Sequence, residues 1–309
     1  MEKIFIDGSA GTTGLRIRER LAQRRDIELI LLSEERRKDP EARRQALAAA
    51  DIAFLCLPDA AAIEAVALAQ GSSTVIIDTS TAHRVNDAWT YGFPELTGQK
   101  PRITAAKRIA NPGCHASGFI ALVAPLVEAG LLDPGAPLSC VSLTGYSGGG
   151  KKMIADYEEP ANADALAAPR LYGLGQQHKH LPEMAKFCGL TRPPIFSPIV
   201  SSYYAGMEVI VPLHAADVNG DLKKLRNAYR AYYTGKLIRY VDNADESGFV
   251  SAGAFAGRDD MQIAVFGNDD RITLVSRFDN LGKGASGAAI QNMNIVLGLD
   301  ETTGLNIGG

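Results

Sequence analysis

The stretch KIFIDGSAGTTGLRIRERLAQRR, residues 3–25, sets the architecture of the N-terminal half of this chain. It passes from a short apolar run through a glycine-rich segment into an amphipathic pattern of helical period, which predicts a strand, a turn and a helix. Glycines let the backbone approach a pyrophosphate, whose charge meets free N–H groups at a helix N-terminus. The stretch therefore predicts a dinucleotide-binding turn, and a turn that binds nothing is the weaker interpretation. The residues predicted to contact the dinucleotide are Gly8, Ser9, Ala10, Gly11, Thr12, Thr13 and Gly14.

Strand and helix patterns alternate through the first hundred residues. A second strand is expected at residues 27–33, a helix and a buried strand at 46–58, a helix at 60–70 and another strand at 73–80. This order predicts an α/β domain with a doubly wound parallel sheet of the Rossmann type.

The end of the second predicted strand bears on which dinucleotide is bound. An NAD-selective site often has an acidic residue there, whereas this strand is expected to end at Ser33 and is followed by EERRK at 34–38. A hydroxyl with Arg36 or Arg37 suits a ribose 2′-phosphate, which favours NADP. Because two glutamates share the segment, a solvated charged loop is the alternative.

Length and composition limit the class of protein. A chain of 309 residues suggests about two domains, and its net charge of −3 gives no reason to expect nucleic acid. No apolar run reaches the roughly 18 residues of a membrane span, so no membrane partner is expected. The four cysteines lie far apart, which indicates reduced thiols in a cytoplasmic protein and no metal site.

The segment NPGCHASG, residues 111–118, bends the chain before a predicted helix. Cys114 is expected at that helix's N-terminus, where partial positive charge lowers a thiol's pKa and stabilises its thiolate. A buried cysteine at a tight turn is the alternative. The preceding nucleotide-binding half favours a nucleophile.

A cysteine nucleophile needs a proton partner, and the chain contains five histidines. His178 and His180 stand in QQHKHLPEM, where an extended backbone directs both side chains to one face. Glu183 follows and is a candidate to orient an imidazole. His115 is set aside, because neighbouring side chains diverge at a helix start. A zinc site is disfavoured, because no third ligand is evident.

The segment GYSGG, residues 145–149, offers a different nucleophile, Ser147. Its layout after a strand and before a helix matches that of a hydrolase nucleophile elbow. A serine hydrolase leaves both the glycine-rich turn and the Pro-Gly-Cys turn without a role.

The last third predicts a second domain. Residues 206–215 and 260–280 alternate like antiparallel strands, residues 221–236 form an amphipathic helix, and 282–299 a helix that starts with small residues. An α+β domain with a mixed or antiparallel sheet is expected.

Together these motifs resemble those of the N-acetyl-gamma-glutamyl-phosphate reductase family in its shorter form. The resemblance runs essentially end to end and rests on GSAGTTG, IDTSTAHR, YGFPEL, NPGCHASG, TGYSGGGKK, QHKHLPE and DNLGKGASGAAIQNMNIVLG. It implies the NADPH-dependent reductive dephosphorylation of N-acetyl-glutamyl phosphate to its semialdehyde in arginine synthesis. It also implies the fold of aspartate-semialdehyde and glyceraldehyde-phosphate dehydrogenases, with an NADP-binding domain at 1–114 completed by 284–309, and a catalytic and oligomerisation domain at 115–283.

The resemblance also implies roles for single residues. Cys114 is the acylated nucleophile, and His180 with His178 is the acid/base and positioning pair. Ser147, Gly148 and Asn280 contact cofactor or substrate. The implied partners are a small-molecule substrate and further copies of the chain, in a homodimer or homotetramer. An aspartate or lysine-pathway semialdehyde dehydrogenase is the close alternative.

One segment departs from the family pattern. Where an arginine is expected before MEVIVPL, the chain reads SSYYAGM at 201–207. Another basic residue must then bind the phosphate or carboxylate of the substrate. The candidates are Lys151, Lys152, Arg277 and Lys283.

Overall fold

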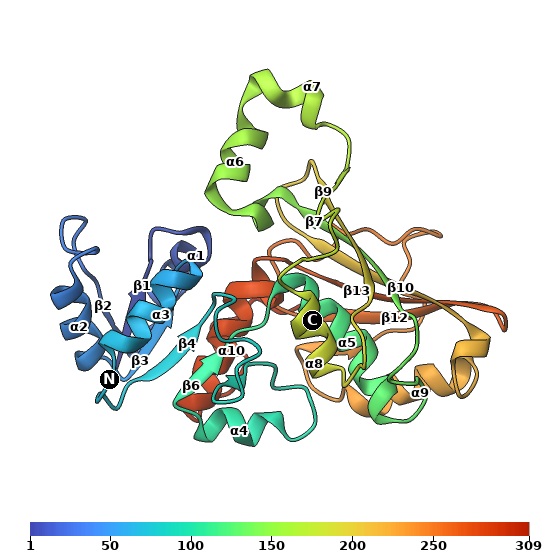
Figure 1. Cartoon of the computed structure of the whole chain (residues 1–309), viewed down its shortest axis with the longest axis horizontal. Coiled ribbons are helices and arrows are strands. Elements are labelled where there is room, and N and C mark those ends of the chain that lie inside the picture. The colour runs from blue at the N-terminus through green and yellow to red at the C-terminus, as the bar shows by residue number, and fades with distance from the viewer. Residues whose placement is uncertain (309) are drawn as a thin grey trace. The chain divides into compact units, whose positions relative to one another are not determined.

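The computed structural model describes residues 1–308, which divide into two compact units (Figure 1). The first unit consists of Met1–Pro112 and Ala285–Leu305. The second consists of Gly113–Gly284 and takes in the residues that follow Leu305. The chain therefore crosses from one unit to the other directly before Cys114.

The first unit is built on a parallel sheet with the strand order β2-β1-β3-β4-β6-β5. Most residues of its central strands are apolar and buried, because helices cover both faces of the sheet. The strands are β1 (Glu2–Asp7), β2 (Ile27–Ile30), β3 (Ile52–Leu55), β4 (Val75–Asp78), β5 (Thr90–Tyr91) and β6 (Arg108–Ala110). The predicted doubly wound sheet is confirmed, although β2 ends at Ile30 and leaves Ser33 beyond the strand.

Two hydrophobic cores lie on the two faces of this sheet. Ile4 and Ile6 of β1 belong to one core and Phe5 to the other, as the alternation of a strand requires. The last helix of the chain, α10, contributes Ile290 and Met293 to the first core, so a C-terminal segment completes the N-terminal unit. The helices of this unit are α1 (Thr12–Leu21), α2 (Pro40–Ala49), α3 (Asp59–Leu68), α4 (Gln99–Ala105) and α10 (Gly287–Val296).

The second unit contains a mixed sheet with the order β11-β12-β13-β10-β7-β9-β8. The antiparallel pairing of β10 with β13 and of β13 with β12 is the pairing expected from the alternating pattern, whereas β7 and β9 run parallel. The strands are β7 (Ser139–Gly145), β8 (Arg170–Leu171), β9 (Ile195–Ser201), β10 (Met207–His214), β11 (Ile238–Tyr240), β12 (Met261–Gly267) and β13 (Arg271–Phe278).

Helix α5 (Cys114–Glu128) packs closely on this sheet because Gly118 lacks a side chain. A Cβ at Gly118 would collide with Val209 of β10, and the Gly118 carbonyl accepts a hydrogen bond of 3.2 Å from the Ser276 hydroxyl of β13. The other helices of the unit are α6 (Gly150–Glu158), α7 (Ala163–Leu166), α8 (Leu181–Phe187) and α9 (Leu222–Tyr232). Short 3-10 segments lie at Tyr146–Gly149, Pro160–Asn162 and Ala215–Asp217, and a π-helical turn at Gly282–Ser286.

Helices α6 and α7 form an arm that projects from the sheet beside β7 and β9 (Figure 1). Helix α6 has no buried residue. Within residues 1–308, none of the helices has the length and apolar character needed to cross a bilayer.

Candidate active site

Cys114 is the first residue of α5. Gly113 is the N-cap residue with an extended backbone, and the first turn of the helix contains no acidic side chain. Partial positive charge at a helix N-terminus stabilises a thiolate, so this position favours the reactive form of the cysteine. By contrast, burial raises the thiol pKa of Cys56 to about 12 and also raises the thiol pKa of Cys140. The thiols of Cys56 and Cys140 therefore stay protonated at neutral pH, which disfavours reaction at either residue.

Glu183 is connected to the turn that carries Cys114. Its Oε1 atom accepts a hydrogen bond of 2.8 Å from the backbone N–H of Gly113. Glu183 lies in the first turn of α8 and is buried. The sequence suggested that Glu183 orients an imidazole, whereas this contact shows that it also braces the backbone before Cys114.

Three imidazoles meet in the same unit. The ring centroids of His178 and His180 lie 4.8 Å apart, and the His115 ring is 5.7 Å from the first and 5.5 Å from the second. The expectation of an extended backbone at 178–180 is wrong, because these residues form the turn that leads into α8. The ring of His115, which the sequence set aside as a proton partner, also lies in this cluster. Phe196 of β9 packs against the rings of His115 and His178.

Tyr172 is a site residue that sequence analysis missed. Its hydroxyl lies 2.7 Å from Nε2 of His115, while Nδ1 of His115 lies 2.7 Å from the Ser142 hydroxyl. Burial, together with His178 and Lys179, lowers the pKa of His115 to about 3. Burial and the charge of Cys114 raise the pKa of Tyr172. At neutral pH, therefore, an uncharged imidazole contacts an uncharged tyrosine beside Cys114.

The candidate basic residues differ in their burial and in where they lie relative to α5, the helix that begins at Cys114. Lys283 is buried and precedes Gly284, where a Cβ would lie 2.9 Å from Cβ of Cys114. Arg277 points away from α5, since the neighbouring Ser276 faces Gly118 and Arg277 instead contacts Glu246 and Gln262. Arg277 is therefore an incorrect candidate for this site. Lys151 and Lys152 are exposed on α6.

Ser147 does not have the surroundings of a serine nucleophile. It is buried, and its hydroxyl accepts a hydrogen bond of 3.0 Å from the Asn280 amide. A nucleophilic serine needs a base that takes its proton, and an amide N–H is a donor. Asn280 also accepts a hydrogen bond of 2.9 Å from the Gly206 N–H, so it fastens two loops together. Gly148 is exposed beside them.

The glycine-rich turn of the first unit has the shape of a phosphate cradle. Gly8 has φ +86°, and a Cβ there would collide with the Cys56 carbonyl oxygen. A Cβ at Gly14 would collide with the Gly8 carbonyl oxygen, and Gly11 caps α1. Oγ1 of Thr12 is buried without a hydrogen-bond partner among residues 1–308. A bound phosphate would satisfy that hydroxyl and the N–H groups at the start of α1, so the residues fit a dinucleotide.

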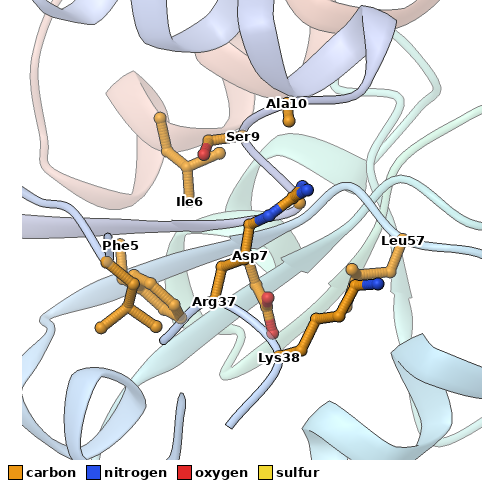
Figure 2. Close-up of a pocket in the computed structure, with 10 residues that line it drawn as sticks. Phe5, Ile6, Asp7, Ser9, Ala10, Arg37, Lys38 and Leu57 are labelled. Atoms are coloured by element: carbon orange, nitrogen blue, oxygen red, sulfur yellow. The ribbon is translucent and has the colours of Figure 1, made fainter. Parts of the chain in front are cut away.

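A pocket adjoins this turn (Figure 2). Ser9 and Ala10 line it together with Arg37 and the carboxyl end of β1. Lys38 also lines it, and sequence analysis missed this residue although it directly follows Arg37. Ser33 and Arg36 are not among its lining residues. The Ser33 carbonyl accepts hydrogen bonds from the backbone N–H groups of Arg36 and Arg37, so it shapes the turn.

Asp7 lines the pocket, but its carboxylate forms an ion pair with the buried Arg43. Its carboxylate lies 2.9 Å from the guanidinium of Arg43. Burial raises the pKa of Asp7 and Arg43 opposes that shift. Arg37 and Lys38 also line the pocket (Figure 2), and the Arg37 guanidinium lies 2.6 Å from the carboxylate of Glu34. In residues 1–308, no group of three or more His, Cys, Asp or Glu side chains is placed to hold a metal ion.

Comparisons with known proteins agree with both units. Residues 38–103 match the NAD binding domain of semialdehyde dehydrogenase, and residues 114–280 match its dimerisation domain. The chain is similar in fold to aspartate semialdehyde dehydrogenase II from Vibrio cholerae, with a TM-score of 0.74 and 16% identity over 96% of this chain and 98% of that one. A probable aspartate-semialdehyde dehydrogenase from Pseudomonas aeruginosa gives a TM-score of 0.72 and 16% identity over the same shares.

Sequence relatives are closer. N-acetyl-gamma-glutamyl-phosphate reductases from Brucella suis, Brucella ovis and Brucella abortus are each 51% identical over 306 residues, which cover 96% of this chain and 99% of theirs. Such identity over nearly the full length of both chains defines the family. The chain belongs to the N-acetyl-gamma-glutamyl-phosphate reductases, within the semialdehyde dehydrogenase fold.

Proposed function

We propose that this chain reduces N-acetyl-glutamyl phosphate to N-acetyl-glutamate semialdehyde with release of phosphate, the third step of arginine synthesis, and that it does so through a thioester on Cys114. The observation that carries the mechanism is Cys114 at the N-terminus of α5, in the unit where His115, His178 and His180 cluster. A thiolate there has the charge stabilisation that a nucleophile needs.

NADPH, when bound, supplies the hydride that reduces the thioester. The backbone N–H groups at the start of α1 and the Thr12 hydroxyl would hold its pyrophosphate, in the cradle that Gly8 and Gly14 leave open. Arg37 and Lys38 would bind the ribose 2′-phosphate.

In the first chemical step, the Cys114 sulfur attacks the acyl carbon and the carbon–phosphate oxygen bond breaks. Phosphate leaves with the electron pair of that bond, and a thioester remains. Backbone N–H groups at the start of α5 would stabilise the oxyanion that forms during attack. Lys283 is buried and directly precedes Gly284, where an added Cβ would meet Cys114. We assign Lys283 to the phosphate or carboxylate of the substrate.

After reduction, the carbon carries sulfur, hydrogen and an oxyanion, which takes a proton from the histidine pair and becomes a hydroxyl group. Collapse breaks the carbon–sulfur bond, returns the electron pair to the Cys114 sulfur and transfers the hydroxyl proton to a histidine. His180, with His178 beside it, is the proposed acid/base pair. Glu183 holds the Gly113 backbone in place during these steps.

The reverse reaction tests the proposal. NADP+ should be reduced by N-acetylglutamate semialdehyde only when phosphate is present, and Cys114→Ala should abolish this reduction. Full activity of Cys114→Ala would overturn the thioester mechanism. Aspartate semialdehyde and lysine-pathway semialdehydes, assayed in parallel, separate the related enzymes. Ser147→Ala should still reduce NADP+ at a measurable rate, whereas a serine hydrolase would lose all of its activity.

We also propose that the enzyme is a homodimer or homotetramer that works in the cytoplasm. Phe196 of β9 faces the histidine cluster, so its neighbour Ile195 points to the opposite face of the sheet. Leu171 of β8 pairs with Ile199 and lies on that same opposite face. The side chains of Ile195 and Leu171 are 65% and 52% exposed. Another copy of the chain would cover this apolar face, which lies within the match to a dimerisation domain. Light scattering of Ile195→Glu should show loss of the oligomer. The reducing conditions of the cytoplasm would keep the Cys114 thiol free of disulfide bonds.

A further inference from the structure

Asn111 lies where the chain is about to leave the first unit. The chain leaves that unit after Pro112 and re-enters it at Ala285. The side-chain amide of Asn111 donates a hydrogen bond of 3.1 Å to the Ala285 carbonyl. This hydrogen bond therefore joins the departing segment to the returning one inside the first unit.

The same two segments also meet in the second unit. Cys114 is three residues after Asn111, and Gly284 is the residue before Ala285. A Cβ at Gly284 would lie 2.9 Å from Cβ of Cys114, so the backbone of Gly284 packs directly against the cysteine. Lys283 comes immediately before Gly284. The amide of Asn111 thus acts within a few residues of both the proposed nucleophile and the proposed anion ligand.

Asn111 is itself held in place by the first unit. It is 1% exposed, and its backbone N–H donates a hydrogen bond of 2.7 Å to the Asp78 carbonyl at the end of β4. Its backbone carbonyl accepts a hydrogen bond of 3.0 Å from Nε of Arg84. Its Oδ1 atom accepts one of 3.3 Å from the Asn292 amide of α10. Every polar group of Asn111 is therefore hydrogen-bonded, and the residue is a rigid support for whatever it contacts.

Little freedom remains between Asn111 and the cysteine. The ring of Pro112 fixes its φ angle. Gly113 is the N-cap of α5, and its N–H is held by Glu183 at 2.8 Å. A shift at Asn111 is therefore passed along the backbone to Cys114.

We propose that Asn111 is a positioning residue, which acts through its hydrogen bond to the Ala285 carbonyl. The bond holds the segment of Lys283 and Gly284 against the turn that presents Cys114. It thereby sets the distance between the nucleophilic sulfur and the cation that we assign to the phosphate or carboxylate of the substrate. This inference rests on the proposed function, and specifically on the roles of Cys114 and Lys283.

The residue type at position 111 fits this role. An asparagine side chain donates from its nitrogen and accepts at its oxygen, and both atoms are used, towards Ala285 and Asn292. A carboxylate of the same size accepts but cannot donate, so Asn111→Asp removes the bond to Ala285 and keeps an acceptor for Asn292. Asn111→Asp therefore tests the donor with almost no change in volume.

The test is the reverse assay, in which N-acetylglutamate semialdehyde reduces NADP+ in the presence of phosphate. For Asn111→Asp, kcat should fall about tenfold and the KM for phosphate should rise about tenfold, because a small displacement of reacting groups is costly in rate. The Kd of NADPH, measured by fluorescence titration, should stay within about twofold of wild type, since the cradle at residues 8–14 is unchanged.

Thr74→Val is the matched control for a loss of stability alone. Thr74 is also buried in the first unit, and its hydroxyl donates hydrogen bonds of 2.6 and 3.0 Å to the carbonyls of Leu47 and Ala50. Its removal should lower the melting temperature and leave kcat and the KM for phosphate unchanged. The same kinetic losses in Thr74→Val and Asn111→Asp would overturn the assignment, because destabilisation would then explain both.

Gly284→Ala perturbs the same spacing from the other segment and remains informative where Asn111→Asp fails to fold. The new methyl group would press on Cys114, so kcat should fall and the KM for phosphate should rise as in Asn111→Asp. Wild-type kinetics in either folded variant would overturn the inference. An inactive wild-type enzyme would reject the proposed function and this inference with it. Equal activity of wild type and Asn111→Asp would reject the Asn111 assignment alone.

Discussion

Glu183 and Gly113, 70 residues apart in the chain, are joined by a hydrogen bond of 2.8 Å from the Gly113 N–H to Oε1 of Glu183. The bond connects the first turn of α8 with the N-cap of α5. His180 is the N-cap residue of α8, so the same short segment supplies an imidazole and the brace for the cysteine turn. The position of Cys114 thus depends on a buried side chain from a distant part of the sequence.

Removing this brace should loosen the turn before Cys114. Glu183→Ala leaves the buried Gly113 N–H without that acceptor, which costs about 1–3 kcal/mol of stability. The melting temperature and kcat should both fall. Glu183→Gln keeps a carbonyl oxygen at the same reach and should retain most of the stability. Equal melting temperatures for the two variants would show that the hydrogen bond contributes nothing.

A side chain at Gly8 should damage dinucleotide binding. Gly8→Ala introduces a Cβ that collides with the Cys56 carbonyl oxygen, at a backbone φ of +86°. The turn must shift, so NADPH affinity measured by fluorescence titration should fall at least about tenfold. Gly71→Ala is the matched control, because Gly71 has φ +80° with no atom within 4 Å of a new Cβ. It should lose about 1 kcal/mol of stability and keep full affinity.

The pocket predicts which cations discriminate NADPH from NADH. Arg37→Ala and Lys38→Ala should each weaken NADPH binding roughly tenfold and leave NADH binding unchanged, because only NADPH carries the 2′-phosphate. The loss should shrink at high salt. Arg44→Ala removes an exposed arginine that pairs with Glu41, and serves as the charge control. A loss of affinity for both dinucleotides would show that these side chains contact a part of the cofactor that NADPH and NADH share, and not the 2′-phosphate.

The uncharged state of His115 should make the protein sensitive to acid. Its folded pKa of about 3 lies below the value of about 6.5 that is usual for an exposed histidine, so the unfolded chain binds the proton more tightly. Stability is therefore lost as pH falls from about 6.5 towards 3, with about 2 kcal/mol lost between pH 7 and pH 5. Urea unfolding at the two pH values measures this loss. His115→Gln, which carries no titratable group, should show a smaller difference between them. An unchanged difference would mean that His115 is protonated in the folded state.

Local sequence patterns were sufficient to predict the elements that follow from backbone sterics or from a regular alternation of apolar residues. The glycine spacing in residues 8–14 predicted the turn, because Gly8 and Gly14 occupy positions where a Cβ collides with backbone. The alternating run at 206–215 predicted β10, since each strand presents one face to a core. Pro112 and Gly113 likewise predicted where α5 begins.

Predictions failed where a residue's surroundings come from distant segments. The surroundings of His115 were not predicted, because Ser142, Tyr172 and Phe196 reach its ring from other elements. Arg277 was a plausible anion ligand by residue type, but the alternation of β13 directs it away from α5. Lys38 was passed over because only the path of the chain after β2 brings it to the pocket.

By itself, the sequence determined the alternation of strands and helices, the glycine cradle and the cysteine at a helix start, because each depends on backbone sterics and periodicity within about twenty residues. Only the tertiary structure decided which imidazoles and hydroxyls meet, which cations face the pocket and how Glu183 reaches Gly113. Those relationships depend on strand order and on the face each strand presents. Sheet packing sets both, and no local pattern encodes them.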